Sequence, residues 1–167
     1  MSHPMLFQIE HEGRMLRGIP LSVDRIAQVL ALEESCFPDP WSEQLFRQEA
    51  RPEPHRWNLL LMDGEDLAAY AISWVVSGET HLLNFAVRPD LQGRGLGRRF
   101  LRWLMEAARK AGDTVFLLEV RASNDRARGL YESEGLKTVT HRDGYYPDTG
   151  EKALVMMAFL QNPEEKP

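Results

Sequence analysis

The stretch from Asn84 to Arg98, NFAVRPDLQGRGLGR, constrains the fold more than any other part of this chain. It begins within an apolar run rich in β-formers, from Leu82 to Val87, and Pro89 ends that run because proline cannot donate to a β-ladder. A helical spacing of apolar residues starts soon afterwards. Between the two, three glycines alternate with long side chains: Gly93, Gly95 and Gly97. The pattern predicts a strand, a glycine loop and a helix in direct succession.

A glycine loop that leads into a helix is suited to binding phosphate. Glycine tolerates positive φ angles and has no Cβ, so several backbone N–H groups can approach one anion. The helix dipole adds about half a positive charge at the same end. A Walker A loop would need Gly-Lys-Ser/Thr where the chain has Gly97-Arg98-Arg99. A dinucleotide fingerprint would need a third glycine where Arg98 stands, so a pyrophosphate of another ligand is expected.

Length and composition predict one ordinary globular domain. The chain has 167 residues, of which 43% are apolar and 27% are charged. The single Cys36 excludes an internal disulfide and, with no apolar leader in residues 1–18, predicts a cytoplasmic protein. The net charge of −5 argues against direct nucleic-acid binding, and no apolar run is long enough to suggest a membrane partner. The histidines are isolated, so no metal is expected.

The order of predicted elements indicates an α/β (α+β) protein with a mixed sheet of about seven strands and helices on both faces. One domain is expected over residues 15–160, between an N-terminal extension at 1–14 and a disordered tail at 161–167. The extension either adds a short strand at Leu6–Ile9 or frays. The expected strands are residues 16–21, 57–62, 67–76, 80–87, 114–120, 136–142 and 152–160, and the expected helices are about 22–32, 42–50, 96–111 and 124–134.

These elements and motifs resemble the GNAT N-acetyltransferases over nearly the whole chain. Gln92-x-x-Gly95-x-Gly97 is similar to their acetyl-CoA signature. LEVRASN at 118–124, LYE at 130–132, PWSE at 40–43 and YYP at 145–147 resemble the RimI-type alanine N-acetyltransferases, which acetylate small-subunit ribosomal protein eighteen. The resemblance implies a GNAT fold with a mostly antiparallel sheet. It also implies acetyl transfer from acetyl-CoA to the N-terminal α-amine of a basic ribosomal protein.

Such a reaction needs a base for the amine and gains from an acid near the departing thiolate. Glu119 lies near the carboxyl end of an apolar strand, where α/β sheets bind ligands, and is the candidate general base. The alternative is a structural ion pair with Arg121 or another basic residue. The resemblance implies that Tyr131 is the general acid; otherwise it is a core tyrosine. Direct attack of the amine in a ternary complex requires no covalent enzyme intermediate.

The resemblance also implies which residues hold acetyl-CoA. Strand backbone would contact the pantetheine arm, and loop N–H groups would contact the pyrophosphate. Asn124 would contact the arm, cap the following helix, or do both. The side chains of Arg94, Arg98 and Arg99 either add charge near the phosphates or are solvated. The expected cofactor residues are Phe85, Ala86, Val87, Gln92, Gly93, Arg94, Gly95, Leu96, Gly97, Arg98, Asn124 and Tyr131.

Four aromatic residues are candidates for an acceptor-binding wall: Phe37, Trp41, Tyr145 and Tyr146. They could equally anchor their own loops. A GNAT enzyme acting on another protein N-terminus, a lysine side chain or a small-molecule amine stays open as an alternative. A non-catalytic acyl-CoA-binding module is a further alternative, against which the presence of both Glu119 and Tyr131 argues. The sequence gives no prediction of oligomeric state.

Overall fold

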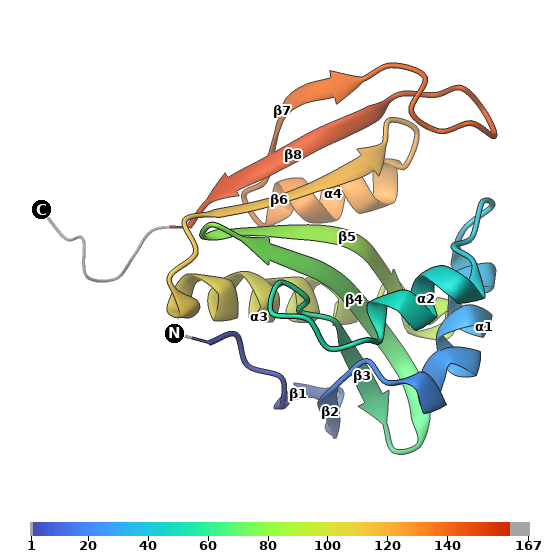
Figure 1. Ribbon diagram of the computed structural model, residues 1–167, viewed down its shortest axis with the longest axis vertical. Coiled ribbons are helices and arrows are strands. Elements are labelled where there is room, and N and C mark those ends of the chain that lie inside the picture. Colours follow the sequence, from blue (N-terminus) through green and yellow to red (C-terminus); the bar gives the residue numbers. More distant parts are fainter. Residues whose placement is uncertain (1, 161–167) are drawn as a thin grey trace, which may run out of the picture.

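A single eight-stranded sheet forms the centre of the molecule in the computed structural model, which describes residues 2–160 (Figure 1). The predicted disorder of the tail at 161–167 lies outside the described residues. The strand order is β1-β2-β3-β4-β5-β6-β8-β7, and only the β5–β6 pair is parallel among the described strands. The strands are β1 (Phe7–His11), β2 (Arg14–Pro20), β3 (Leu59–Asp63), β4 (Asp66–Val76), β5 (Glu79–Val87), β6 (Val115–Arg121), β7 (Lys137–Arg142) and β8 (Ala153–Phe159).

Helices cover both faces of this sheet, as predicted. Alternation along β3 shows this directly, because successive side chains of a strand point to opposite faces. Leu59 and Leu61 pack into the apolar cluster that contains the helices at 96–111 and 125–133, whereas Leu60 and Met62 pack into the cluster that contains the helices at 26–36 and 43–49. The mixed, mostly antiparallel fold is therefore confirmed. The helices are α1 (Ile26–Cys36), α2 (Glu43–Glu49), α3 (Leu96–Ala111) and α4 (Asp125–Ser133), and 3-10 turns occupy Val23–Arg25 and Pro89–Leu91.

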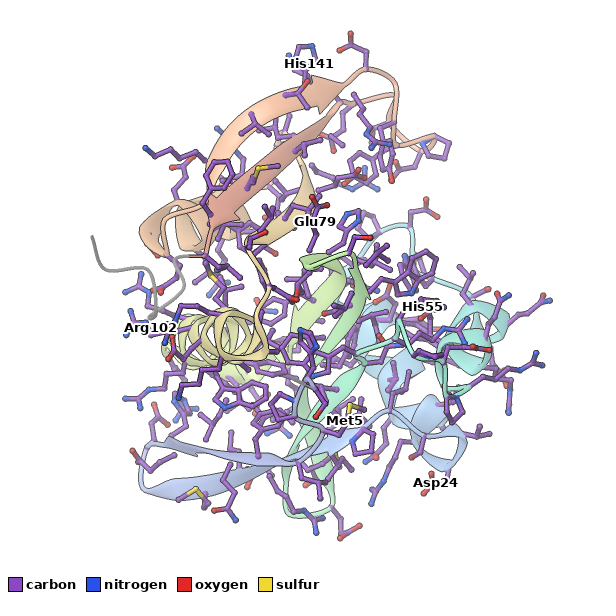
Figure 2. The ribbon with its side chains drawn as sticks, turned by 60° about the vertical axis from the view of Figure 1, so that its left-hand side comes forward. Met5, Asp24, His55, Glu79, Arg102 and His141 are labelled. Atoms are coloured by element: carbon purple, nitrogen blue, oxygen red, sulfur yellow. The ribbon has the colours of Figure 1, made fainter. Side chains whose placement is uncertain are left out.

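The eighth strand comes from the first residues of the chain. β1 pairs antiparallel with β2 across a tight turn at Glu12 and Gly13, so the strand alternative for this segment is the one observed. The ring of Phe7 stacks on Trp103 of α3, with 3.6 Å between ring centroids. At the opposite edge of the sheet all residues of β7 are exposed, and Figure 2 shows His141 pointing outward from that edge. No helix within residues 2–160 has the length and apolar content to cross a membrane.

The capping signals in the sequence correspond closely to the helix boundaries. α3 has the predicted limits and ends at Gly112, whose φ of 99° is the left-handed conformation favoured at such ends. Ser42 caps α2 by accepting a hydrogen bond from the Leu45 N–H. Asn124 caps α4 in the same way through the Ala127 N–H. The first helix differs: Ser22 precedes a 3-10 turn without a side-chain cap, and α1 begins only at residue 26.

β5 and β6 pair only over their first halves. Residues 79–82 pair with 115–118, and beyond Leu82 and Leu118 the two strands continue without pairing to each other. Figure 1 shows β5 curving away from β6 toward its carboxyl end. The result is an opening in the middle of the sheet, and α3 and α4 follow directly from its two sides.

Candidate functional site

Two adjoining pockets lie where β5 and β6 diverge. The first, called here the tyrosine pocket, has a volume of about 420 Å³. The second, the glycine pocket, has a volume of about 520 Å³ and borders the loop between β5 and α3. Five residues line both pockets and so mark their junction: Phe37, Phe85, Asn124, Ala127 and Tyr131.

The glycine pocket gathers most of the residues expected to hold the cofactor. Two expected residues are absent from its described lining. Leu96 is fully buried in the core, and the guanidinium of Arg94 forms an ion pair with Glu12 of the β1–β2 turn. The lining contains the expected residues Phe85, Ala86, Val87, Gln92, Gly93, Gly95, Gly97, Arg98, Asn124 and Tyr131.

The loop has the backbone geometry that its glycines predict. Gly93 and Gly95 have φ angles of +74° and +86°, in the left-handed region that other residues avoid. Gly97 is different, since it has ordinary helical backbone. A Cβ on Gly97 would lie 3.4 Å from Val87 Cγ2 and 3.5 Å from Leu130 Cδ2. Gln92 holds the loop to β5, because its Nε2 donates to the Val87 carbonyl at 2.8 Å.

Most arginines near the loop are already paired with carboxylates. Arg98 lies 3.6 Å from Glu134, and Arg99 lies 3.9 Å from Glu10. The sequence analysis missed Arg126, which reaches the glycine pocket from α4 on the opposite side. No local motif distinguishes this arginine, because only the packing of α4 beside the loop brings it there.

Glu119 lines the tyrosine pocket and is also ion-paired. Its Oε1 lies 3.2 Å from Nη2 of Arg142 on β7, and the Glu119 side chain is 13% exposed. Tyr145 hydrogen bonds to the same carboxylate, and that bond is the main cause of a raised pKa for Tyr145. The basic partner is thus Arg142 rather than Arg121, and the carboxylate still borders the pocket.

Arg121 connects the end of β6 to the loop between β7 and β8. Its two terminal nitrogens each donate to Asp148 at 2.9 Å, and Nη1 also donates to Glu151 at 3.2 Å. Its guanidinium carbon lies 3.9 Å from the ring centroid of Tyr146. These hydrogen bonds hold the pKa of Asp148 below its usual range. Arg121 therefore places Tyr146, and burial raises the pKa of that tyrosine to about 12.

Tyr131 lies at the junction of the two pockets. It comes from α4, is 7% exposed, and burial raises the pKa of its hydroxyl well above the usual range. The hydroxyl is therefore protonated at neutral pH and can act only as a proton donor or a neutral hydrogen-bond partner. Asn124, about two helical turns before it, caps α4 and borders both pockets.

Glu33, a buried carboxylate that the sequence analysis missed, stabilises the wall of the tyrosine pocket that the loop after α1 forms. Glu33 of α1 is 1% exposed and accepts hydrogen bonds from the Trp41 N–H and the Asn84 amide, both at 2.9 Å. The hydroxyl of Tyr70 donates to it as well. These bonds fix the loop after α1 against β4 and β5. All four aromatic residues expected at the acceptor wall line the tyrosine pocket: Phe37, Trp41, Tyr145 and Tyr146.

Comparison with known proteins finds an acetyltransferase family model and individual acetyltransferases that resemble this chain. The family model described as Acetyltransferase (GNAT) family matches residues 26–136. The chain is 42% identical over 130 residues to the ribosomal protein bS18-alanine N-acetyltransferase of Escherichia coli K12, covering 77% of this chain and 86% of that protein. It is 39% identical over 141 residues to the Salmonella typhimurium protein of the same name, covering 83% and 93%.

Solved structures agree with the sequence relatives. The crystal structure of the E. coli ribosomal-protein-S18-alanine N-acetyltransferase superposes with a TM-score of 0.80 at 35% identity, covering 90% of this chain and 97% of that one. Arabidopsis thaliana NAA60, solved in complex with acetyl-CoA, has the same fold with a TM-score of 0.77 at 14% identity, covering 87% and 98%.

Proposed function

This chain belongs to the GNAT family of acetyltransferases, and on that basis we propose that it acetylates the N-terminal α-amine of a protein. The proposed acceptor is the N-terminal alanine of ribosomal protein bS18, the substrate named for a relative that is 42% identical. The proposed acetyl donor is acetyl-CoA. Ribosomal proteins are made in the cytoplasm, which is where we place the reaction. The observation that carries the proposal is the meeting of the two pockets at Tyr131, between the glycine loop and Glu119.

The glycine pocket is assigned to the cofactor. Its loop follows β5 and opens α3, so its backbone N–H groups and the positive end of the helix are available to a pyrophosphate. The pantetheine arm would run along residues 85–87 of β5, where β5 no longer pairs with β6. β4 pairs with the other side of this segment, so the backbone groups on the side that faces β6 are the partners that an amide-containing chain needs. The thioester would then reach the junction of the two pockets.

The tyrosine pocket is assigned to the acceptor amine. An N-terminal α-amine has a pKa of about 7.7–8.0, so it is largely protonated at pH 7. Glu119 takes this proton, the amine nitrogen bonds to the acetyl carbon, and the carbon–sulfur bond breaks. A backbone N–H of β5 stabilises the oxyanion, and Tyr131 gives its proton to the departing thiolate. The nitrogen loses its second proton as the amide forms, and that proton restores the Tyr131 hydroxyl. Because burial raises the pKa of Tyr131, its hydroxyl is protonated at neutral pH and available to donate to the departing sulfur.

Acetyl transfer to short peptides tests the acceptor. One peptide begins with free Ala-Arg, and the other has the same sequence with a blocked N-terminus and an internal lysine. We expect acetylation of the free N-terminus only. Transfer to the blocked peptide alone would refute the α-amine assignment and point to lysine side chains. If the protein bound acetyl-CoA but acetylated neither peptide, both peptide acceptors would be refuted. The remaining functions would be acetylation of a small-molecule amine and non-catalytic binding of acyl-CoA.

Glu119→Gln tests the proposed base. The amide keeps the shape of the side chain but cannot accept the proton, so turnover at neutral pH should fall by about 10²- to 10⁴-fold. The affinity for acetyl-CoA should stay unchanged, because Glu119 lies outside the described lining of the glycine pocket. Glu132→Gln is the matched control, since that exposed carboxylate on α4 lines neither pocket. An unchanged turnover in Glu119→Gln would remove Glu119 as the base.

A further inference from the structure

We propose that Arg126 binds the pyrophosphate of acetyl-CoA from the α4 side, so that the phosphates contact both its guanidinium and the glycine loop. This inference rests on the proposed function, because it takes acetyl-CoA as the ligand of the glycine pocket. It concerns a residue outside the glycine motif, in the first turn of α4.

The first observation is the position of the guanidinium. Arg126 lines the glycine pocket, and its Nη1 donates to Gln92 Oε1 at 3.1 Å. Its Nη2 lies 2.9 Å from the place where a Cβ on Gly93 would be. The charged group therefore lies against the first two residues of the loop, beside the backbone N–H groups expected to meet the phosphates.

The second observation is how Gln92 orients this side chain. The amide nitrogen of Gln92 donates to the Val87 carbonyl at 2.8 Å, and its amide oxygen accepts from Arg126. Both ends of one amide are thus used, and they connect the end of β5 to the guanidinium. A hydrogen bond to one nitrogen leaves the remaining N–H donors of the planar guanidinium free for two phosphate oxygens.

The third observation is charge balance. Arg94, Arg98 and Arg99 each have a carboxylate within 4.0 Å, on Glu12, Glu134 and Glu10 respectively. Among residues 2–160, no carboxylate forms an ion pair with Arg126, and its guanidinium donates instead to the neutral amide of Gln92. A carboxylate beside an arginine offsets part of the positive charge that the arginine presents to an anion. Arg126 carries its full charge into the pocket, and arginine is well matched to phosphate geometry.

Calorimetric titration of Arg126→Gln with acetyl-CoA tests the inference. Loss of a hydrogen bond to a charged group predicts a dissociation constant raised by about 10- to 150-fold. Acetylated 3′-dephospho-CoA should show the same loss, because it retains the pyrophosphate. Acetylpantetheine, used as the donor in a turnover assay, should show no loss in kcat/KM because it has no pyrophosphate. Arg126→Lys should fall between wild type and Arg126→Gln, since lysine keeps the charge without the planar geometry.

Arg99→Gln is the matched control. This exposed arginine also lies near the loop but is outside the described lining of both pockets, and its variant should bind acetyl-CoA as the wild type does. An Arg126→Gln defect that vanished with the dephospho donor would assign the residue to the 3′-phosphate and overturn the inference. An equal loss of kcat/KM with acetylpantetheine would show that Arg126 only stabilises the loop, and this result would also overturn the inference. Unchanged binding in Arg126→Gln overturns this inference alone, whereas wild-type protein that failed to bind acetyl-CoA would overturn the proposed function as well.

Discussion

Gly97→Ala should make the protein more stable while weakening its binding of acetyl-CoA. Gly97 is the second residue of α3 and has ordinary helical backbone. Alanine there removes the entropy cost of a helical glycine, which is about 0.5–1 kcal/mol. The added Cβ meets Val87 and Leu130 at 3.4 and 3.5 Å, which are ordinary contact distances. For a chain of this size the melting temperature should rise by about 1–4 °C.

The same methyl group should interfere with the cofactor. Val87 and Leu130, the neighbours of the new Cβ, both line the glycine pocket, so the methyl enters the space assigned to acetyl-CoA. Displacing one loop N–H from a phosphate costs about 1.5–3 kcal/mol, which corresponds to a dissociation constant about 10- to 150-fold higher. The distinctive expectation for Gly97→Ala is therefore a higher melting temperature together with a weaker affinity for acetyl-CoA.

Gly95→Ala provides the contrast. Its φ of +86° is in the left-handed region, where a side chain costs about 1–2 kcal/mol, although no atom lies within 4 Å of the new Cβ. This variant should lose about 2–8 °C in melting temperature and should also bind acetyl-CoA more weakly. Thermal unfolding without ligand and calorimetric titration with acetyl-CoA measure both quantities. A Gly97→Ala protein that melts lower than wild type, or that binds acetyl-CoA equally well, would refute this reasoning.

Two further predictions concern the loop that carries Tyr146. Arg121→Met should raise the KM for the acceptor peptide and leave the affinity for acetyl-CoA unchanged, with partial recovery in Arg121→Lys. Steady-state kinetics measure this beside the exposed control Arg102→Met, and equal KM values in Arg121→Met and Arg102→Met would contradict it. The depressed pKa of Asp148 means that its pairing with Arg121 is complete above pH about 4 and is lost only as pH falls below that value, so the defect should be constant from pH 6 to 8. The pKa of Tyr146, raised to about 12, makes the folded state keep a proton that the unfolded chain loses from pH about 10, so stability should fall between pH 10 and 12. Tyr146→Phe should show a weaker fall in melting temperature over that range, and identical alkaline profiles would argue against a buried phenol.

Local signals explain why much of the fold could be predicted. The limits of α3 follow from its apolar spacing and the glycine at its end, and the caps at Ser42 and Asn124 depend only on adjacent backbone. The sequence predicts a first helix from Ser22, where the structure instead has a 3-10 turn without a side-chain cap. A serine before an apolar run does not distinguish these two outcomes, because both begin with the same turn.

The contacts within the site depend on tertiary structure and were less predictable. The partner of Glu119 is an example. Arg121 is nearer in sequence, but it is taken up by Asp148 and Glu151, and Arg142 reaches Glu119 from the far side of β8. That contact depends on the register of two strand pairs, which carry no signature in the sequence. The same holds for Arg126, whose position follows from helix packing.

The short pairing between β5 and β6 has a mechanical consequence. Four residue pairs, from Glu79–Val115 to Leu82–Leu118, join one half-sheet of five strands to another of three. The glycine loop continues from the first half-sheet, whereas Glu119 belongs to the second. The two sets of reacting groups are therefore carried by half-sheets whose backbones pair over only a short segment. A ligand lying across that junction adds a cross-link between them, so binding itself should set the alignment on which catalysis depends.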